Sequence, residues 1–201
     1  MQIFEHKHFK TYKPFGYLSQ FTSNEQRQIR KKRFLKDFVP YFKGLMPIGR
    51  LDEKSEGLLL LTTDGKLSNY VNSANIEKEY VVQLDGIITQ NALKWMKDGV
   101  TIGLFGSFYL TKPCKAVQIE TPDFLPLPNA KLRIGVHRPT SWVRVVINEG
   151  KYKQIRKMTA AVGYPTIRLI RVRVGTLYLG TLTEGTIESI SDAKIQHFYA
   201  V

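Results

Sequence analysis

The chain carries the stretch GRLDEKSEGLLLL at residues 49–61. Its four leucines form a short apolar block between Gly57 and the turn-forming residues TTDG at 62–65, which is typical of a strand buried on both faces. The charged residues before this block cannot join the core, so we expect Asp52 on a loop at its edge. Catalytic groups concentrate on such loops, although a solvated acidic turn is the commoner role of a single aspartate.

The composition is that of a folded protein. With 201 residues and 43% hydrophobic residues, the chain is long enough for one large domain or two small lobes. It has no apolar run long enough to span a membrane and no apolar signal peptide at its start, so a cytoplasmic protein is expected. The single Cys114 cannot form an internal disulfide, and the four dispersed histidines show no metal-ligand spacing, so we expect neither a disulfide nor a structural metal.

A large excess of positive charge indicates a polyanionic partner. The 30 Lys and Arg residues exceed the 17 Asp and Glu residues by 13, and the isoelectric point is near 9.8. Charge alone does not distinguish RNA from DNA or from an anionic membrane. Two clusters interleave basic with apolar residues, which favours folded basic surfaces over a disordered tail. They comprise Arg27, Arg30, Lys31, Lys32, Arg33 and Lys36, and then Lys151, Lys153, Arg156, Lys157, Arg168, Arg171 and Arg173.

The order of the predicted elements favours an α+β fold with a mixed, mostly antiparallel sheet and flanking helices, because helices and strands do not alternate strictly. The proline-rich residues 121–129 predict a loop or connector. One helix is predicted to begin after Ser23, because the spacing of Ser23 and Gln26 resembles a capping box. Two further helices are predicted over 89–98 and 151–162, and strands over 80–84, 142–147 and 167–174.

Three separated motifs follow one another along the chain. They are GRLD with GLLLL at 49–61, KEY at 78–80 and EGKYKQIRKM at 149–158, accompanied by KPFGYLSQFT at 13–22 and PTSW at 139–142. Together they resemble the pseudouridine synthases, in the branch that acts on large-subunit ribosomal RNA. The resemblance implies a single catalytic domain over 1–201 with two lobes around an RNA-binding cleft, no cofactor, no membrane partner and a monomeric state.

The resemblance also implies the chemistry, in which a uridine in RNA is detached from its ribose, turned and rejoined through carbon. Asp52 matches the nucleophile, which attacks either the ribose C1′ or the uracil C6. Arg156 matches the basic residue that favours the charged form of this carboxylate, as an arginine that stays protonated is suited to do. Tyr80 matches the tyrosine that packs on the flipped base and handles a proton, although a core strand aromatic is the plainer reading.

The remaining candidate residues concern substrate binding. Leu169 resembles the apolar residue that lines the base pocket, or is equally an ordinary core residue. Phosphate contacts are predicted collectively rather than singly, because most exposed lysines and arginines are only solvated surface. These candidates are Arg50, Lys78, Lys151, Lys153, Lys157, Arg171 and Arg173.

The chain departs from several relatives of this branch because no RNA-binding domain of the ribosomal S4 type is expected before the catalytic domain. RNA binding then depends on the basic surface of the catalytic domain, and the cluster between Arg27 and Lys36 is a candidate. Two other functions remain open. The first is a non-catalytic RNA-binding or ribosome-associated factor, which is disfavoured because Asp52 would repel phosphate. The second is a metal-dependent nuclease, which is disfavoured because this chain has no second, distant carboxylate motif to complete a two-metal site.

Overall fold

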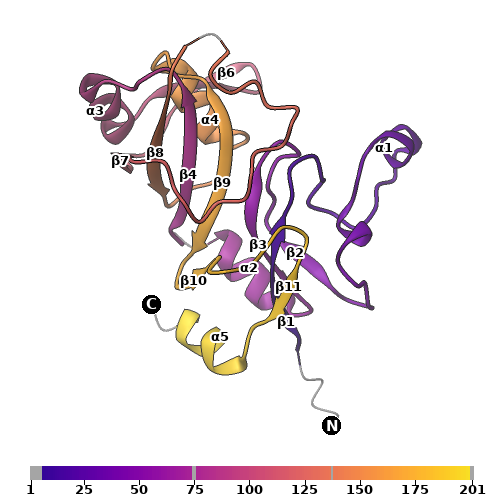
Figure 1. The fold of residues 1–201 in the computed structure, drawn as a ribbon. Coiled ribbons are helices and arrows are strands. Elements are labelled where there is room, and N and C mark those ends of the chain that lie inside the picture. Colours follow the sequence, from indigo (N-terminus) through magenta and orange to yellow (C-terminus); the bar gives the residue numbers. More distant parts are fainter. Residues whose placement is uncertain (1–5, 74–75, 137, 200–201) are drawn as a thin grey trace. The chain divides into compact units, whose positions relative to one another are not determined.

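The computed structural model describes residues 6–73, 76–136 and 138–199, and these form two compact units (Figure 1). The first unit comprises Met1–Ile76 and Arg171–Val201, and the second comprises Glu77–Ile170. One boundary, between Ile170 and Arg171, falls within a strand, and the other, between Ile76 and Glu77, falls just before one.

The first unit is built on an antiparallel sheet. Strand β1 (His8–Lys13) pairs along its whole length with β3 (Glu56–Thr62), from His8 opposite Thr62 to Lys13 opposite Gly57. Two shorter strands extend this pair: β11 (Ile187–Ser189) on β1 and β2 (Met46–Ile48) on β3. Strand β10 (Leu177–Tyr178) pairs instead with β9 (Thr166–Val174), which begins in the second unit and ends in the first.

Strand β3 is buried over all seven of its residues, which confirms the strand predicted from the leucine block. Leu59 and Leu61 pack in one apolar cluster with Leu35, Val39 and Leu45, which come from the segment between β1 and β2. Because neighbouring residues of a strand point to opposite faces, a strand with cover on both faces needs an apolar residue at every position.

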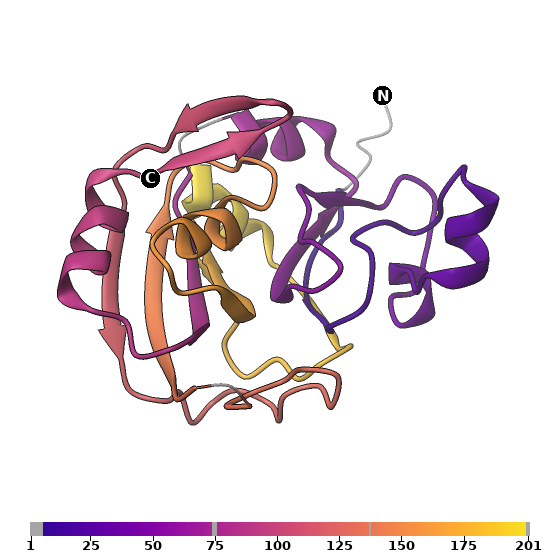
Figure 2. The same cartoon turned by 90° about the horizontal axis from the view of Figure 1, so that it is seen from above.

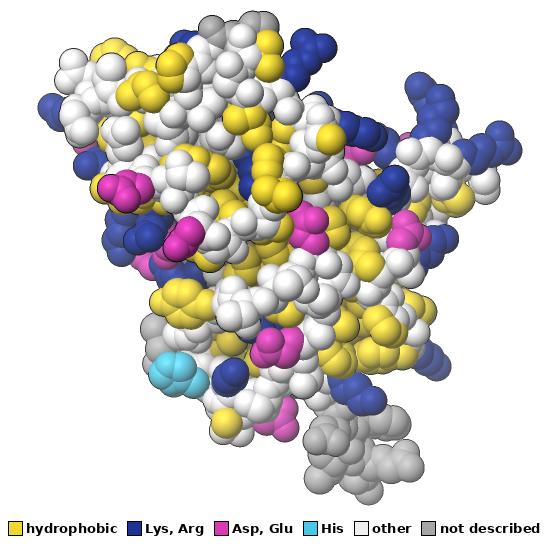
Figure 3. Space-filling model, in the orientation of Figure 1, with side chains coloured by type: hydrophobic (Ala, Val, Ile, Leu, Met, Phe, Trp, Pro, Cys, Tyr) yellow, Lys and Arg dark blue, Asp and Glu magenta, His cyan; other side chains and the backbone are white. Residues whose placement is uncertain are grey.

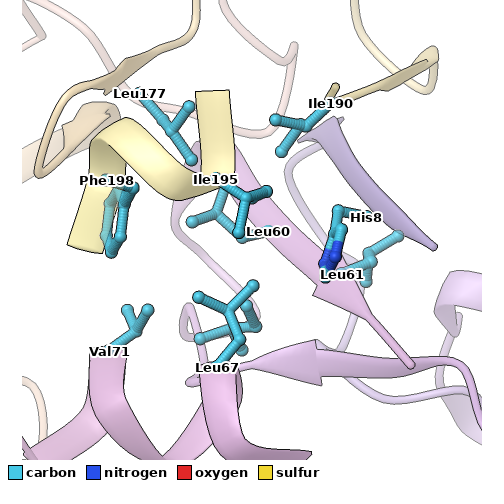
Figure 4. A pocket seen from close by; sticks show the side chains of 10 residues that line it. His8, Leu60, Leu61, Leu67, Val71, Leu177, Ile190, Ile195 and Phe198 are labelled. Atoms are coloured by element: carbon cyan, nitrogen blue, oxygen red, sulfur yellow. The ribbon is translucent and has the colours of Figure 1, made fainter. Parts of the chain in front are cut away.

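Two helices of the first unit cover an apolar space beside β3. Helix α2 (Gly65–Ser73) contributes Leu67 and Val71, and helix α5 (Asp192–Tyr199) contributes Ile195 and Phe198. Figure 4 shows these side chains directed toward Leu60 of β3. His8 lies at the same space, where its Nδ1 is 2.9 Å from the Thr62 hydroxyl and burial lowers the pKa of its imidazole.

The segment between β1 and β2 carries the first basic cluster on a short helix. Helix α1 (Gln26–Lys31) has no buried residue, and a 3-10 turn, η1 (Leu35–Asp37), follows it. The predicted capping box is wrong: Glu25 is the N-cap without a side-chain bond, because the Ser23 hydroxyl accepts instead from the Glu25 amide at 3.1 Å. Lys and Arg side chains gather over α1 in Figure 3, as the sequence predicts for a folded basic surface.

The second unit contains strands β4 to β8 and the first part of β9. Strand β4 (Lys78–Asp85) pairs antiparallel with β8 (Thr140–Ile147), and β8 pairs antiparallel with β7 (Lys115–Ile119). A separate hairpin is formed by β5 (Thr101–Leu104) and β6 (Ser107–Leu110), visible as two antiparallel arrows in Figure 2. The proline-rich residues 121–129 form no helix or strand, as predicted.

The two helices of the second unit test the predicted boundaries. Helix α3 (Gln90–Asp98) is as expected: the Thr89 hydroxyl caps it by accepting from the Ala92 amide at 3.3 Å, and Gly99 follows its end. Helix α4 (Gln154–Ala161) begins three residues later than the predicted 151–162, because Lys153 adopts a left-handed backbone conformation with φ of 51°.

The fold class predicted from the sequence is confirmed. In the described part of the chain the strands follow the sheet order β11-β1-β3-β9-β4-β8-β7, with five α-helices accompanying them. The register pairings given above are all antiparallel. Among the described residues, no helix combines the length and the apolar character that crossing a membrane requires.

Candidate active site

The loop between β2 and β3 presents Asp52, as predicted, with its side chain half-buried. It opens at Gly49, whose φ of 66° is unfavourable for other residues, and a Cβ there would lie 3.0 Å from the Asn72 Oδ1 atom. Ser19 then fixes the peptide groups of Leu51: its hydroxyl accepts from the Leu51 amide at 2.9 Å and donates to the Leu51 carbonyl at 2.8 Å. The backbone beside Asp52 is therefore held before any substrate binds.

A buried lysine holds the other side of this loop. Lys13 has no exposed surface, and its Nζ donates to the carbonyls of Pro14 at 2.9 Å, Tyr17 at 2.6 Å and Glu53 at 3.5 Å. The Gly16 amide also donates to the Glu53 carbonyl at 2.8 Å. Glu53, which follows Asp52, thus accepts one hydrogen bond from the last residue of β1 and one from the turn after this strand.

Burial shifts the titration of Lys13. It lowers the pKa of the ammonium to about 7, and Glu56, Glu53 and Asp52 oppose this shift through their charges. Glu56 is itself buried, and the Tyr12 hydroxyl donates to it at 3.4 Å. Two buried charged residues, Lys13 and Glu56, therefore lie near the Asp52 loop, and the sequence patterns did not indicate either of them.

The basic segment after α1 also contacts this loop. The Lys32 Nζ lies 2.7 Å from a Glu53 carboxylate oxygen, with both side chains partly exposed. The Arg33 guanidinium lies over the Tyr17 ring, 5.5 Å from its centroid. Within the first unit, part of the positive charge predicted to bind RNA is therefore placed beside the loop of the candidate nucleophile.

Tyr80 and Lys78 lie on strand β4 of the second unit. Tyr80 is opposite Val145 and is 9% exposed, and Lys78, opposite Ile147, is half-buried. Tyr80 is therefore packed among core strand residues with a small part of its surface accessible. This placement is compatible with both interpretations that the sequence left open.

Arg156 lies in the first turns of α4, and its Nη1 donates to the Thr166 carbonyl at 3.3 Å. The loop before this helix is ordered by Glu149, whose carboxylate accepts from Gln154 Nε2 at 2.6 Å and from the Tyr109 hydroxyl at 2.6 Å. Leu169 is 5% exposed on β9. The third motif therefore holds Arg156 through a helix whose start is fixed by side-chain bonds.

The predicted phosphate-binding residues differ in their exposure. Arg50 is exposed, but Arg171 is 4% exposed and its Nε donates to the Leu58 carbonyl at 2.8 Å. Arg173 donates to the Gly175 carbonyl at 2.9 Å. A direct phosphate contact requires an accessible guanidinium. The Arg171 side chain is buried in this structure, so the predicted contact would require it to become exposed.

The candidate residues are divided between the two units. Asp52 and Arg50 share a loop of the first unit. In the second unit, Lys153 and Lys157 both approach the Tyr152 ring, and Lys151 approaches the Tyr109 ring. Tyr80, Lys78, Arg156 and Leu169 also belong to the second unit. Over the described residues, no three His, Cys, Asp or Glu side chains lie together as ligands for a metal ion.

The residues that sequence reasoning missed are those that hold the loops. Lys13 and Ser19 both fall in the segment KPFGYLSQFT at 13–22, which carried part of the family resemblance. This segment therefore indicated the family, but the roles of Lys13 and Ser19 could not be predicted from it, because they depend on contacts to residues far along the chain. Glu149 likewise lay in the third motif without an assigned role.

The comparisons with known proteins agree with these motifs. Residues 7–161 match the family described as RNA pseudouridylate synthase. The chain is 36% identical over 180 residues to the ribosomal large subunit pseudouridine synthase E of Vibrio parahaemolyticus, covering 89% of this chain and 71% of that protein. For the protein of the same description from Xanthomonas campestris, identity is 37% over 179 residues, covering 86% and 89% respectively.

A solved structure supports the same assignment. The crystal structure described as a pseudouridylate synthase superposes with a TM-score of 0.75 at 27% identity, and the match covers 96% of this chain and 74% of that one. The matched family region includes Asp52, Tyr80 and Arg156. The chain therefore belongs to the RNA pseudouridine synthases, which are isomerases.

Proposed function

We propose that this chain converts a specific uridine of large-subunit (23S) ribosomal RNA to pseudouridine, with Asp52 as the nucleophile. The names of its relatives from Vibrio and Xanthomonas support the class of RNA. The net charge of +13 supports a polyanionic substrate. The observation that carries the role of Asp52 is its place in a GRLD loop whose backbone is fixed by Ser19, Gly16 and Lys13.

The reaction is an isomerisation, so no atom is gained or lost. The bond between N1 of uracil and C1′ of ribose breaks, and a bond between C5 and C1′ forms. The hydrogen of C5 leaves as a proton, and N1 ends with a proton. The Asp52 carboxylate assists by attacking C1′ or C6 and is released when the new bond has formed.

Tyr80 and Arg156 have supporting roles in this proposal. A target base must leave its stack, which costs a few kcal/mol, and an aromatic ring that packs on the extruded base recovers part of that free energy. Tyr80 supplies this ring and handles a proton of the rearranged base. Arg156 provides a permanently charged group that favours the ionised form of Asp52 in the substrate complex.

The base pocket and the phosphate contacts complete the proposal. Leu169 lines the pocket of the flipped base. Arg50, Lys78, Lys151, Lys153 and Lys157 contribute to phosphate binding as a group, and the predicted RNA-binding cleft, single catalytic domain and monomeric state stay predictions. Positive charge of this kind makes the affinity for RNA strongly dependent on salt.

The test is a modification assay with unmodified 23S RNA and no added metal or cofactor, followed by mapping of pseudouridine at single-nucleotide resolution. The wild-type chain is expected to form product at one position. Asp52→Asn keeps the size of the side chain but removes the nucleophilic carboxylate, so product formation should fall by about three orders of magnitude or more.

The matched control is Asp98→Asn, which makes the same chemical change at an exposed residue near the end of α3. This variant should form product at the wild-type rate. Equal product from Asp52→Asn and wild type would contradict the proposed nucleophile. RNA binding by the wild type without any product would favour the non-catalytic RNA-binding function.

A further inference from the structure

The hairpin of the second unit has an unusual residue at its turn. Leu104 pairs with Ser107, so Phe105 and Gly106 form a two-residue loop, and their φ angles are 48° and 84°. Positive φ at both positions is the geometry that Asn-Gly or Gly-Gly adopts, and a bulky side chain is unfavourable there. The Phe105 side chain is also 89% exposed, so burial in the core does not account for its presence.

The Phe105 ring lies against Tyr152, from the loop that precedes α4. The ring centroids are 5.8 Å apart with an interplanar angle of 30°, and Tyr152 is 52% exposed. Tyr152 precedes Lys153, whose φ is 51°. Among the described residues other than glycine, only Phe105 and Lys153 have positive φ. One of these unfavourable conformations thus belongs to a member of the ring pair, and the other to the residue after Tyr152.

Two lysines lie against the Tyr152 ring of this pair. The Nζ atoms of Lys153 and Lys157 lie 4.9 Å and 5.3 Å from the centroid of the Tyr152 ring. Lys157 also donates to the Gly103 carbonyl at 2.6 Å, which ties helix α4 to strand β5. We call Phe105, Tyr152, Lys153 and Lys157 the aromatic platform.

We propose that the aromatic platform binds an unpaired nucleotide of the RNA substrate, with its base stacked on Phe105 and the adjacent phosphates beside Lys153 and Lys157. Every base has a π-face that can stack on an aromatic ring, and proteins that bind single-stranded RNA combine such rings with basic side chains. The surrounding lysines make this surface complementary to a polyanion. The proposal rests on the proposed function only in taking RNA as the ligand.

Binding of a base would explain why the Phe105 ring is exposed. The Phe105–Tyr152 contact leaves most of the Phe105 surface open, so a base can stack on the exposed ring. A residue that favours the turn, such as Asn, would stabilise the hairpin but provide no stacking surface. The unfavourable backbone of Phe105 is therefore expected to be retained for binding rather than for folding.

The first test measures binding of the intact chain to a short unstructured RNA and to an RNA duplex of the same length. Loss of one base stack corresponds to about 1–3 kcal/mol, which is roughly a 5- to 150-fold weaker dissociation constant. Phe105→Ala and Tyr152→Ala should show this loss for the unstructured RNA and a smaller loss for the duplex. Unchanged affinity for the unstructured RNA in both variants would overturn the proposal and leave this surface to a protein partner.

The matched control is Phe108→Ala, in the same hairpin and with a side chain 86% exposed. Phe108 is opposite Gly103, so it lies on the hairpin face away from Ile102, which packs on Met158 of α4. This variant should bind the unstructured RNA within twofold of the wild type. An equal loss in Phe108→Ala and Phe105→Ala would contradict a specific platform.

A second variant separates folding from binding. Phe105→Asn suits the turn, so its Tm should equal or exceed that of the wild type while its affinity for the unstructured RNA falls as in Phe105→Ala. Salt dependence distinguishes stacking from charge: Phe105→Ala should leave the slope of log K against log salt unchanged, and Lys153→Gln should reduce it by roughly 0.7. A folded Phe105→Asn variant with wild-type affinity would overturn the proposal.

These measurements are independent of catalysis. RNA binding that depends on Phe105, in a chain that forms no pseudouridine, would support the platform and contradict the proposed function. Pseudouridine formation by a chain whose Phe105 variants bind RNA normally would support the proposed function and contradict the platform.

Discussion

At the scale of single residues, Lys13 is the most consequential side chain that the proposed reaction does not use. It is wholly buried, yet three backbone carbonyls accept from its Nζ, and one of them belongs to Glu53, the neighbour of Asp52. Hydrogen bonds to carbonyls reduce the penalty of burying an ammonium but do not remove it. Lys13 therefore fixes the Asp52 loop at some expense of stability.

This burial predicts a pH dependence of folding. The folded-state pKa of Lys13 is about 7, whereas a lysine in the unfolded chain titrates near 10.5. Between these pH values the unfolded chain binds more protons, so the contribution of Lys13 to the free energy of unfolding rises with pH, by at most about 1.4 kcal/mol per unit. Below pH 7 the penalty is complete and this dependence disappears.

Comparison of the wild type with Lys13→Met isolates this contribution. Urea unfolding at pH 7, 8 and 9 should show a difference between the two free energies that changes with pH in favour of the wild type. The Met variant lacks the titrating group but is similar in length. A difference that stays constant across this range would show that Lys13 keeps an ordinary pKa in the folded protein.

At the scale of elements, strand β3 connects the core to the site. The Asp52 loop leads directly into it, and the strand is buried over its whole length. The packing of Leu60 against α2 and α5 on one side, and of Leu59 against the segment before β2 on the other, therefore sets where the loop ends. The strand is the rigid support that the candidate nucleophile requires.

Truncation of this support should be destabilising. Leu60 is 2% exposed, so Leu60→Ala leaves a cavity in the first unit and should lower the free energy of unfolding by about 2–5 kcal/mol. Leu110→Ala is the control, because Leu110 is 66% exposed on β6 and its truncation should cost less than about 0.5 kcal/mol. Denaturant unfolding monitored by circular dichroism measures both, and equal effects of the two changes would contradict this view of β3.

At the scale of the whole molecule, the charge of +13 determines how the chain meets RNA. The positive residues are spread over both units. Their combined electric field increases the affinity for RNA and the rate of association, but it provides no sequence specificity. Local contacts can be distinguished from the general field only by comparing charge changes of equal size at different places. Helix α1 offers this comparison, because none of its residues is buried.

We predict that the basic segment around α1 contacts RNA directly. Reversal of Arg30 and Lys31 to Glu should weaken binding to 23S RNA by more than about tenfold and reduce the salt slope by roughly 1.4–1.8, as expected for two lost phosphate contacts. Reversal of the exposed Lys94 and Lys97 on α3 makes the same change in net charge and should have a smaller effect. Equal losses in the two pairs would assign the effect to net charge alone.

Much of the fold, together with the loop position of Asp52, could be predicted because the relevant signals are local. The block at 58–61 predicts the buried strand β3, since a strand covered on both faces requires apolar residues at successive positions. Thr89 and Gly99 predict both ends of α3, since capping depends on residues within one turn. The motifs around Asp52, Tyr80 and Arg156 identify the family, which the comparisons confirm.

Other features were decided only by the tertiary structure. Arg171 looked like a surface cation but is buried against Leu58, and Lys13 lies under the Asp52 loop. Phe105 and Tyr152 are distant in the chain and meet only because the hairpin packs beside α4. Sequence patterns report preferences over a few neighbouring residues, whereas the burial of a charge and the pairing of two rings depend on segments that folding brings together.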